Sequence, residues 1–355
     1  SRRQRQMCIR DRGSTPYRDL FASINLQADE VIFGRDYEAS LSVLHNVQNY
    51  ENSTTMGRPG MNKKIVNSYL MADGSRFTDK AGYETMTFDQ ECQNRDPRLA
   101  QTIRTPGYTR IGSTKKEAPN LAYTMTGYHL IKYSMTANYD EYNKSCNDIP
   151  LFRTAEVYLN FAEAKAELGT LKQADINKSI KLLRDRVGMT NLDMELANSK
   201  PDPYLMSAAT GYPNVKGANQ GVILEIRRER TIELAMEGFR YYDIMRWKEG
   251  KLFENDLLGI YVPGPGTYDL DKDGTDDVCF YVGTKPAGNV PLYLEIGEQI
   301  RLSNGESGYI ICHSLITKKW NEDRDYLYPV PISERTLSNG VITQNPGWND
   351  GLNFN

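Results

Sequence analysis

The densest chemistry in this sequence lies in a short acidic stretch, DLDKDGTDDV, at residues 269–278. Asp269, Asp271 and Asp273 occupy the first, third and fifth positions of an EF-type calcium loop, and Asp277 occupies the ninth. Gly274 stands at the sixth position, where such a loop needs a tight turn. Carboxylate oxygens at this spacing suit a hard divalent cation. We therefore predict that these aspartates hold a structural Ca²⁺ ion.

The twelfth position of the loop departs from that pattern. Phe280 stands where a calcium loop has a bidentate Glu, so another carboxylate, Asp276 or Asp277, would have to replace it. The alternative interpretation is a solvated hairpin turn at Asp273 and Gly274 between two short strands. Calcium is favoured because acids this close together repel one another unless a cation lies between them.

Aromatic side chains in loops form a second group, because a sugar presents flat C–H faces and a rim of hydroxyl groups. The sequence has 23 Tyr and 3 Trp. Trp320 is flanked by Lys318, Lys319 and Asn321, which could hydrogen bond to those hydroxyls. The alternative for each ring is a place in the packing of the scaffold. The residues that we predict to bind ligand are Tyr50, Tyr108, Tyr261, Tyr268 and Trp320; Tyr17 is another tyrosine in an expected loop.

A glycoside hydrolase is the main catalytic alternative. Such an enzyme needs two carboxyl groups facing each other across a cleft, and the chain has 46 acidic residues. Their number alone is no signal, because they cluster with bases on expected helices and no nucleophile, phosphate-binding or zinc-protease motif occurs. His45, His129 and His313 lie at no metal-ligand spacing. The sequence therefore predicts no catalytic residue.

The charge distribution argues against a nucleic-acid partner. The formal net charge is -3, but residues 1–12 hold five Arg against one Asp, which leaves -7 on the remainder. A body of that sign repels phosphate backbones. The opening SRRQRQMCIRDR lacks the apolar core and cleavage site of a signal peptide, so we interpret residues 1–12 as a non-native junction.

The type of secondary structure that positions these groups changes along the chain. Residues 13–152 predict a loop-rich ligand-binding region with short helices, and residues 153–250 predict tetratricopeptide-like helical hairpins. Residues 251–315 predict an insertion of loops and short strands that contains the acidic loop, and residues 316–355 form an extended C-terminal segment. The predicted fold class is mainly α, with loops and short β-strands.

The hairpin prediction depends on two helices that together have the length of one tetratricopeptide unit. They are expected over residues 153–169 and 171–188, and each ends at a glycine. A hairpin of this kind cannot bury its apolar face alone, so we expect a partner hairpin to cover it. The apolar positions of the first helix that recur at helical spacing are Val157, Phe161, Ala164 and Leu168.

The segment ERTIELAMEGFRYYDIMRWKEG, residues 229–250, carries an acid or a base at almost every turn. Gly238 predicts a break between two helices within it. Opposite charges three residues apart share one helical face, so we expect ion pairs that fasten the last hairpin rather than catalytic groups. The expected pairs are Glu237 with Arg240, Arg240 with Asp243, and Asp243 with Arg246.

An ordered set of motifs resembles one family, the SusD/RagB proteins of the Bacteroidetes outer membrane. The middle of the chain contains IVNSYLMADG, NRDPRL and IRTPG, followed by LFRTAEVYLNFAEAKAELG and ILEIRRERTIELAMEGFRYYDIMRW. The C-terminal segment adds YLYPVPISE and QNPGW. These motifs cover about residues 60–348 in the order that the family has.

The resemblance implies a fold of tetratricopeptide-like hairpins, an α/α superhelix, that carries a loop-rich ligand-binding region. It also implies a cell-surface lipoprotein of the outer membrane that captures oligosaccharides and delivers them to a SusC-like TonB-dependent barrel. The chain departs from the family at its start, where the signal peptide, the lipidated Cys and the first helical repeats would precede residue 13. The family's ligand residues vary with the glycan, so none is carried over.

Two alternatives to non-catalytic glycan binding stay open. One is the glycoside hydrolase, and the other is a tetratricopeptide-type scaffold that binds peptides. An exposed aromatic platform away from the hairpin groove would favour glycan binding over the scaffold.

Overall fold

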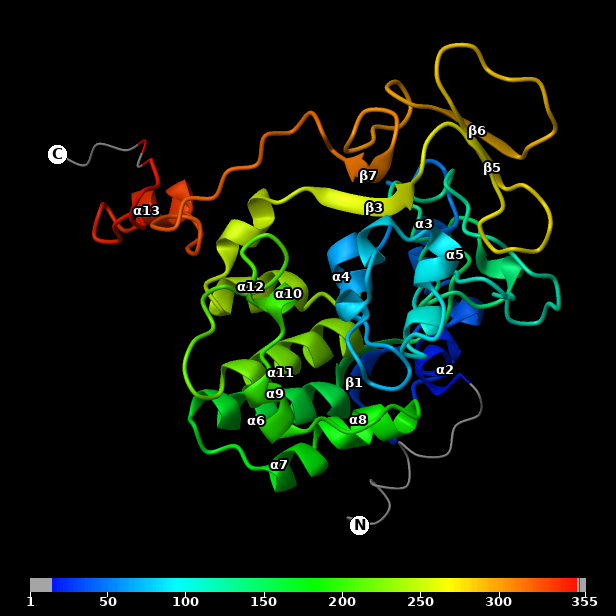
Figure 1. Ribbon diagram of the computed structural model, residues 1–355. Helices are drawn as coiled ribbons and strands as arrows, with labels where there is room; N and C mark the ends of the chain where they lie inside the picture. Colours follow the sequence, from blue (N-terminus) through cyan, green and yellow to red (C-terminus); the bar gives the residue numbers. More distant parts are fainter. Residues whose placement is uncertain (1–14, 350, 352–355) are drawn as a thin grey trace.

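The computed structural model describes residues 15–349 and 351 of the chain, so the expected junction at residues 1–12 lies outside the described part. The longer helices gather in one part of the molecule, and the strands that follow residue 250 lie in another (Figure 1). The prediction of a mainly helical fold with loops and short strands is confirmed at this level. Among the described residues, no helix combines the length and the apolar character that crossing a membrane requires.

The helical part is built around α11 (Gln220–Glu233), which is buried from Gly221 to Glu233. It packs against α4, α6, α8 and α9. Ala and Glu dominate α6, which favours a helix, and Gly169 follows its end with a φ of +67°. The helices of this part are α6 (Thr154–Glu167), α7 (Gln173–Asn177), α8 (Ile180–Arg186), α9 (Met194–Ser199), α10 (Pro203–Met206), α11 and α12 (Arg240–Arg246).

The region before α6 consists of loops that connect short elements. Its helices are α2 (Pro16–Ala22), α3 (Val47–Glu51), α4 (Lys63–Ser68) and α5 (Phe88–Glu91), with 3₁₀ turns at Ala39–Leu41, Phe77–Asp79, Tyr83–Thr85, Leu99–Gln101 and Ala137–Tyr139. Two strands, β1 (Val31–Arg35) and β2 (Ile149–Arg153), form an antiparallel ribbon that leads into α6. Since α4 contacts both α11 and β3, it links the helical part to the strands.

The strands after α12 form two small sheets. β3 (Leu257–Val262) pairs antiparallel with β7 (Gly308–Cys312). β4 (Gly266–Tyr268) pairs antiparallel with β5 (Val278–Tyr281), which pairs in parallel with β6 (Leu292–Glu295). Their buried residues join α4 and the end of α11 in one apolar cluster. A 3₁₀ turn at Gly250–Glu254 (η6) precedes β3, and α13 (Ile332–Leu337) lies to one side of the body (Figure 1).

Two glutamates of α11 hold a buried ionic network together. Glu229 accepts from Arg184 at 2.8 Å and also pairs with Arg98. Glu233 pairs with Arg98 at 3.0 Å, with Arg153 at 2.8 Å and also with Arg186. Burial would raise the pKa of Glu233, but the three guanidinium groups outweigh it and hold this pKa well below its usual value. The carboxylate is therefore charged, and it fixes residues from three separate segments onto one helix.

Further carboxylates extend this network to the start of the helical part. Glu30 pairs with Arg186 at 2.7 Å and with Arg153 at 3.0 Å. Glu237 pairs with Arg153 at 2.6 Å and with Lys132 at 2.7 Å. The ribbon, α8 and the end of α11 are thus joined through buried charge.

The prediction of which face of the first helix is buried is wrong. The exposed fractions are 52% for Val157, 41% for Phe161 and 75% for Leu168, and Ala164 is also exposed. The helix has a second apolar face, and its residues join those of α11 in one buried apolar cluster. The face that the structure buries consists of Ala155, Leu159, Ala162 and Ala166.

The second helix expected over residues 171–188 is divided into α7 and α8. Ser179 separates them, with φ and ψ of -132° and -92°, and its hydroxyl donates to the carbonyl of Asp175 at 2.7 Å. A serine that bonds to the backbone in this way competes with the helical hydrogen bonds.

The break predicted at Gly238 is confirmed, because α11 ends at Glu233 and α12 begins at Arg240. Gly238 has a φ of +86°, which favours glycine, and Met236 also has a positive φ. The turn allows α12 to leave at an angle to α11 (Figure 1).

Of the three ion pairs expected around this break, one is confirmed. Asp243 pairs with Arg246 at 2.8 Å within α12. Glu237 bonds instead to Lys132 and Arg153, because it lies in the turn and points into the buried network. Arg240 donates to the hydroxyls of Tyr212 and Thr231 at 2.8 and 3.0 Å.

Replacing Glu233 with Gln is expected to lower the free energy of unfolding by about 3–5 kcal/mol, because Arg98, Arg153 and Arg186 would lose their shared charge partner. Urea denaturation measures this loss. Glu167→Gln is the matched control, since the Glu167 side chain is 49% exposed and its oxygen lies 3.6 Å from Arg227; a change of less than about 0.5 kcal/mol is expected there. Equal losses in the two variants would contradict the dependence of the three arginines on Glu233.

Candidate functional site

The acidic loop connects β4 to β5. Carboxylate oxygens of Asp269, Asp271 and Asp273 lie within 4.8 Å of one another, a span that one cation with oxygen ligands at about 2.3–2.6 Å can bridge. Gly274 makes the turn with a φ of +92°. Since the strands on either side are paired, the loop is also the hairpin connection that the alternative interpretation proposed, although β5 pairs with β4 rather than with β3.

Asp277 lies outside this group of three. Its carboxylate accepts from the backbone N–H of Leu270 at 2.7 Å. Burial is the largest of the effects that together raise the pKa of Asp277 to about 6. The neighbouring carboxylates act in the same direction, and the Leu270 hydrogen bond opposes them. Phe280 is buried in β5, so the twelfth position supplies no oxygen side-chain ligand. Three carboxylates fit the core of a calcium site, and calcium binding itself stays a prediction.

The predicted tyrosines do not come together in one place. Tyr50 is half exposed, whereas Tyr108 is 6% exposed, with the guanidinium groups of Arg18 and Arg104 at 5.1 and 5.4 Å from its ring centre. Tyr108 therefore offers no free ring face. Tyr17 is fully buried and donates to the carbonyl of Glu233 at 2.8 Å, as the packing alternative expected.

The two predicted tyrosines of the strands are partly buried. Tyr261 in β3 meets Tyr309 edge to face at 5.8 Å between ring centres. Tyr268 in β4 packs on Phe280 at 5.7 Å and donates to the carbonyl of Gly264 at 2.7 Å.

Trp320 belongs to an aromatic row of five residues. Its ring centre lies 5.3 Å from Phe253 and 5.0 Å from Tyr326, and Phe253 continues to Tyr241 at 5.7 Å. A Cβ at Gly250 would lie 2.0 Å from the indole ring, so only glycine permits this packing. The row ends at the surface, where Tyr242 is 63% exposed. The aromatic row is Tyr242, Tyr241, Phe253, Trp320 and Tyr326.

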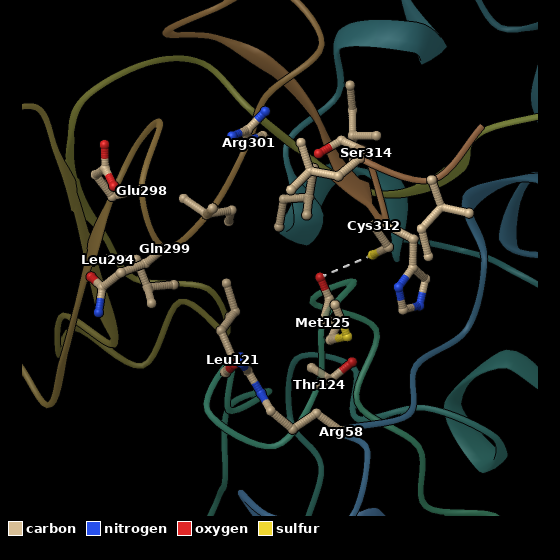
Figure 2. Close-up of a pocket in the computed structure, with 16 residues that line it drawn as sticks. Arg58, Leu121, Thr124, Met125, Leu294, Glu298, Gln299, Arg301, Cys312 and Ser314 are labelled. Carbon is tan, nitrogen blue, oxygen red and sulfur yellow. Dashed lines mark hydrogen bonds between the residues drawn. The ribbon is translucent and has the colours of Figure 1, made fainter.

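A cavity of about 450 Å³ opens between the loops of residues 121–125 and the segment that surrounds β7. Figure 2 shows Arg58 and Arg301 on opposite sides of it, with Gln299 on a third side. Leu121 and Met125 supply apolar surface, and the thiol of Cys312 donates to the carbonyl of Met125 at 3.3 Å. Apolar walls with a few polar groups at this volume are typical of a small-molecule site.

The residues of this cavity could not be found from the sequence. They come from segments as far apart as residues 58 and 316 and form no motif. Arg58, for example, reaches the cavity by donating to the carbonyl of Leu121 at 2.5 Å. Only the fold brings such positions together.

Two of the three histidines have structural roles. Nε2 of His129 lies 2.8 Å from the carbonyl of Glu51, and its Nδ1 accepts from the backbone of Asn120. Nε2 of His45 lies 2.9 Å from the carbonyl of Asn147, and its Nδ1 accepts from Val47. Burial lowers the pKa of both imidazoles. Both rings are therefore neutral packing groups.

The comparison with protein families decides where this chain belongs. The profile of the SusD family matches residues 26–348. The chain belongs to the SusD family. The predicted resemblance is thus confirmed, and the match covers the helical part, the strands and most of the C-terminal segment.

Solved structures support the SusD fold. A SusD-like protein from Bacteroides fragilis NCTC 9343 is 21% identical with a TM-score of 0.60, and covers 95% of this chain and 58% of its own. A SusD-like carbohydrate binding protein from the same organism is 20% identical with a TM-score of 0.52, and the match covers 95% and 62%. This chain therefore spans about three-fifths of the length of these relatives. No curated protein matches it.

Replacing Asp271 and Asp273 with Asn is expected to lower the Tm in calcium-containing buffer, because the variant loses two of three clustered carboxylates. Differential scanning fluorimetry in calcium and in chelator measures this. In chelator the double variant should match or exceed the parent, since mutual repulsion is relieved. Asp36→Asn, in an exposed loop, controls for a general effect of charge. An equal loss of Tm in both buffers would contradict the calcium site.

Proposed function

We propose that this chain is the ligand-binding part of a cell-surface protein that captures oligosaccharides without cleaving them. The observation that carries the proposal is the match of the SusD family over residues 26–348. A solved relative with the same fold is described as a SusD-like carbohydrate binding protein. We further propose that the longer protein is a lipoprotein of the outer membrane, anchored through an N-terminal Cys outside this chain, and that it delivers glycan to a SusC-like TonB-dependent barrel.

Two features of the structure support glycan binding. The cavity of Figure 2 has the volume of a site for one or two sugar rings and offers guanidinium and amide donors beside apolar walls. The aromatic row offers ring faces at the surface, on which the C–H face of a sugar can stack. The row is formed by α12, η6 and the C-terminal segment. Figure 1 shows α12 on the other side of α11 from α7 and α8, and this favours glycan binding over a peptide-binding scaffold.

Non-catalytic binding is favoured over hydrolysis because the buried glutamates at the end of α11 are paired with cations. Glu229, Glu233 and Glu237 are occupied by buried guanidinium or ammonium groups. Their pKa values are lowered, so none of these three can be the general acid of a glycoside hydrolase, which has a raised pKa. The pKa is raised, mainly by burial, to about 7 at Glu51 and to about 6 at Asp277, but Glu51 is 1% exposed and accepts from Ser134, and Asp277 lies in the acidic loop. We also propose that calcium at the acidic loop, if bound, stabilises the β4–β5 hairpin and takes no part in capture.

Affinity electrophoresis and calorimetry against a panel of soluble polysaccharides and oligosaccharides test the proposed function. Retardation by at least one glycan, without release of reducing ends over hours, is expected. A chain that releases reducing ends would instead be a hydrolase. Failure of every glycan to bind, together with binding of a peptide library, would favour the scaffold.

Trp320→Ala is expected to weaken binding of the glycan found in that panel by about tenfold, which corresponds to about 1.4 kcal/mol, because the row loses the ring that joins Phe253 to Tyr326. Calorimetry measures the affinity, and thermal denaturation measures the accompanying loss of packing on Phe253 and Tyr326. Tyr142→Ala is the matched control, because Tyr142 is 63% exposed in another loop. If Trp320→Ala unfolds the chain, or leaves the affinity unchanged, the row is packing and not a platform.

A further inference from the structure

A second cavity, of about 330 Å³, lies between α4, α12 and η6. Three of its lining residues are cations, namely Lys64, Arg240 and Lys318, and one, Asp256, is an acid. We refer to it as the cationic cavity. Most buried cations of this chain lie beside carboxylates, so the excess of positive charge around the cationic cavity is unusual for this structure.

The partners of the three cations leave this charge largely uncompensated. Arg240 donates to the neutral hydroxyls of Tyr212 and Thr231. Lys318 donates to the carbonyl of Asn255 at 2.6 Å, and its distance to Asp256 is 3.9 Å. The side chain of Asp256 is 64% exposed, so solvent screens its charge.

Two donors that line the cavity have no acceptor among the described residues. The ammonium nitrogen of Lys64 and the amide nitrogen of Asn255 are both buried atoms without a hydrogen-bond partner. Leaving a buried donor unpaired costs about 1–3 kcal/mol, and more when it is charged. Both groups donate, so a ligand that brings acceptor oxygens into the cavity would satisfy them.

The electrostatics of Lys64 point the same way. Burial is the largest of the effects that together lower the pKa of Lys64 to about 8. The positive charges of Lys318 and Arg240 act in the same direction, and Asp256 opposes them. An anion in the cavity would oppose this lowering of the pKa, because it would stabilise the ammonium form.

The cationic cavity also adjoins the aromatic row. Phe253 lines the cavity and lies 5.3 Å from Trp320 and 5.7 Å from Tyr241. A ligand whose charged group enters the cavity can therefore continue over ring faces. The volume suits one sugar residue rather than a long polyanion, and the net charge of -7 on the body of the chain disfavours nucleic acid.

We propose that the cationic cavity binds the carboxylate or sulfate group of an acidic sugar residue, with Lys64, Lys318 and Arg240 as counter-charges and the amide of Asn255 as a neutral donor. This inference rests on the proposed function, since it specifies the class of oligosaccharide that the chain captures. No bond is formed or broken, and the ligand and the protein gain only ion pairs and hydrogen bonds.

The direct test measures the pKa of Lys64 by ¹³C NMR of labelled lysine side chains, with the Lys64 signal assigned by its loss in Lys64→Met. Sodium glucuronate, the 6-sulfate of glucose and inorganic sulfate are the anionic probes, and glucose is the neutral probe. The two sugar acids are expected to raise this pKa from about 8 toward its ordinary value of 10.5, and glucose is expected to leave it unchanged. Binding near pH 8 should then take up protons and weaken as the pH rises further.

Matched variants distinguish binding by the cavity residues from a general effect of the protein's charge. Lys64→Met should abolish sugar-acid binding and keep or raise the Tm, because it removes a buried, unpaired ammonium group. Lys80→Met, at an exposed lysine, should leave binding unchanged, and Asn255→Ala should weaken it about tenfold without changing the pKa response in direction. Binding by Lys64→Met equal to that of the parent would overturn the proposal.

The outcomes distinguish this proposal from the proposed function. A response to inorganic sulfate but to no sugar acid would overturn the assignment to an acidic sugar. If no anion changes the pKa of Lys64 while a neutral glycan binds in the panel, the cationic cavity proposal fails and glycan capture stands. If the sugar acids bind and no oligosaccharide does, the cavity stands and oligosaccharide capture fails.

Discussion

The rest of the structure depends on the charge buried along α11. Glu229 and Glu233 accept from Arg98, Arg153, Arg184 and Arg186, which come from three segments separated by many residues. Burying one of these groups alone would be strongly unfavourable, and only simultaneous placement of all partners compensates the lost hydration. The network therefore fixes which segments meet at α11. It specifies the arrangement of the fold more than it stabilises it, because well-packed apolar residues can be equally stable.

That constraint determines where the surfaces for binding can form. The C-terminal end of α11 is held by Arg153 and Arg186, so the turn through Gly238 sends α12 outward from a fixed point. The start of α12 supplies Tyr241 and Tyr242 to the aromatic row and Arg240 to the cationic cavity. On the other side, α4 contacts both α11 and β3 and carries Lys64. The aromatic row and the cationic cavity are thus held in place by α11 and its buried ionic network.

The sequence predicted those parts whose signals are local. The motifs identified the family, Gly238 marked the break between α11 and α12, and the spacing of Asp269, Asp271 and Asp273 placed three carboxylates in one loop. The prediction was wrong where tertiary packing decides which of two faces or partners a residue takes. α6 has two apolar faces, and periodicity alone selected the face of Val157 and Phe161, which α11 does not cover. Glu237 had a base three residues away, but the turn directed it to Arg153. Both cavities combine distant segments, so no pattern within one segment could predict them.

The cations of the scaffold differ from the cations of the two cavities in their hydrogen-bond partners. Arg98 and Arg153 are fully buried, yet each meets two or more carboxylates, and neither has capacity left for a ligand. Arg58 and Arg240 meet neutral oxygens instead, and the ammonium group of Lys64 meets no acceptor among the described residues. In low dielectric such charge is relieved by an anion or by many oriented oxygens. Sugars with hydroxyl and acid groups supply both, because each ring carries several acceptor oxygens and the acid group adds a negative charge.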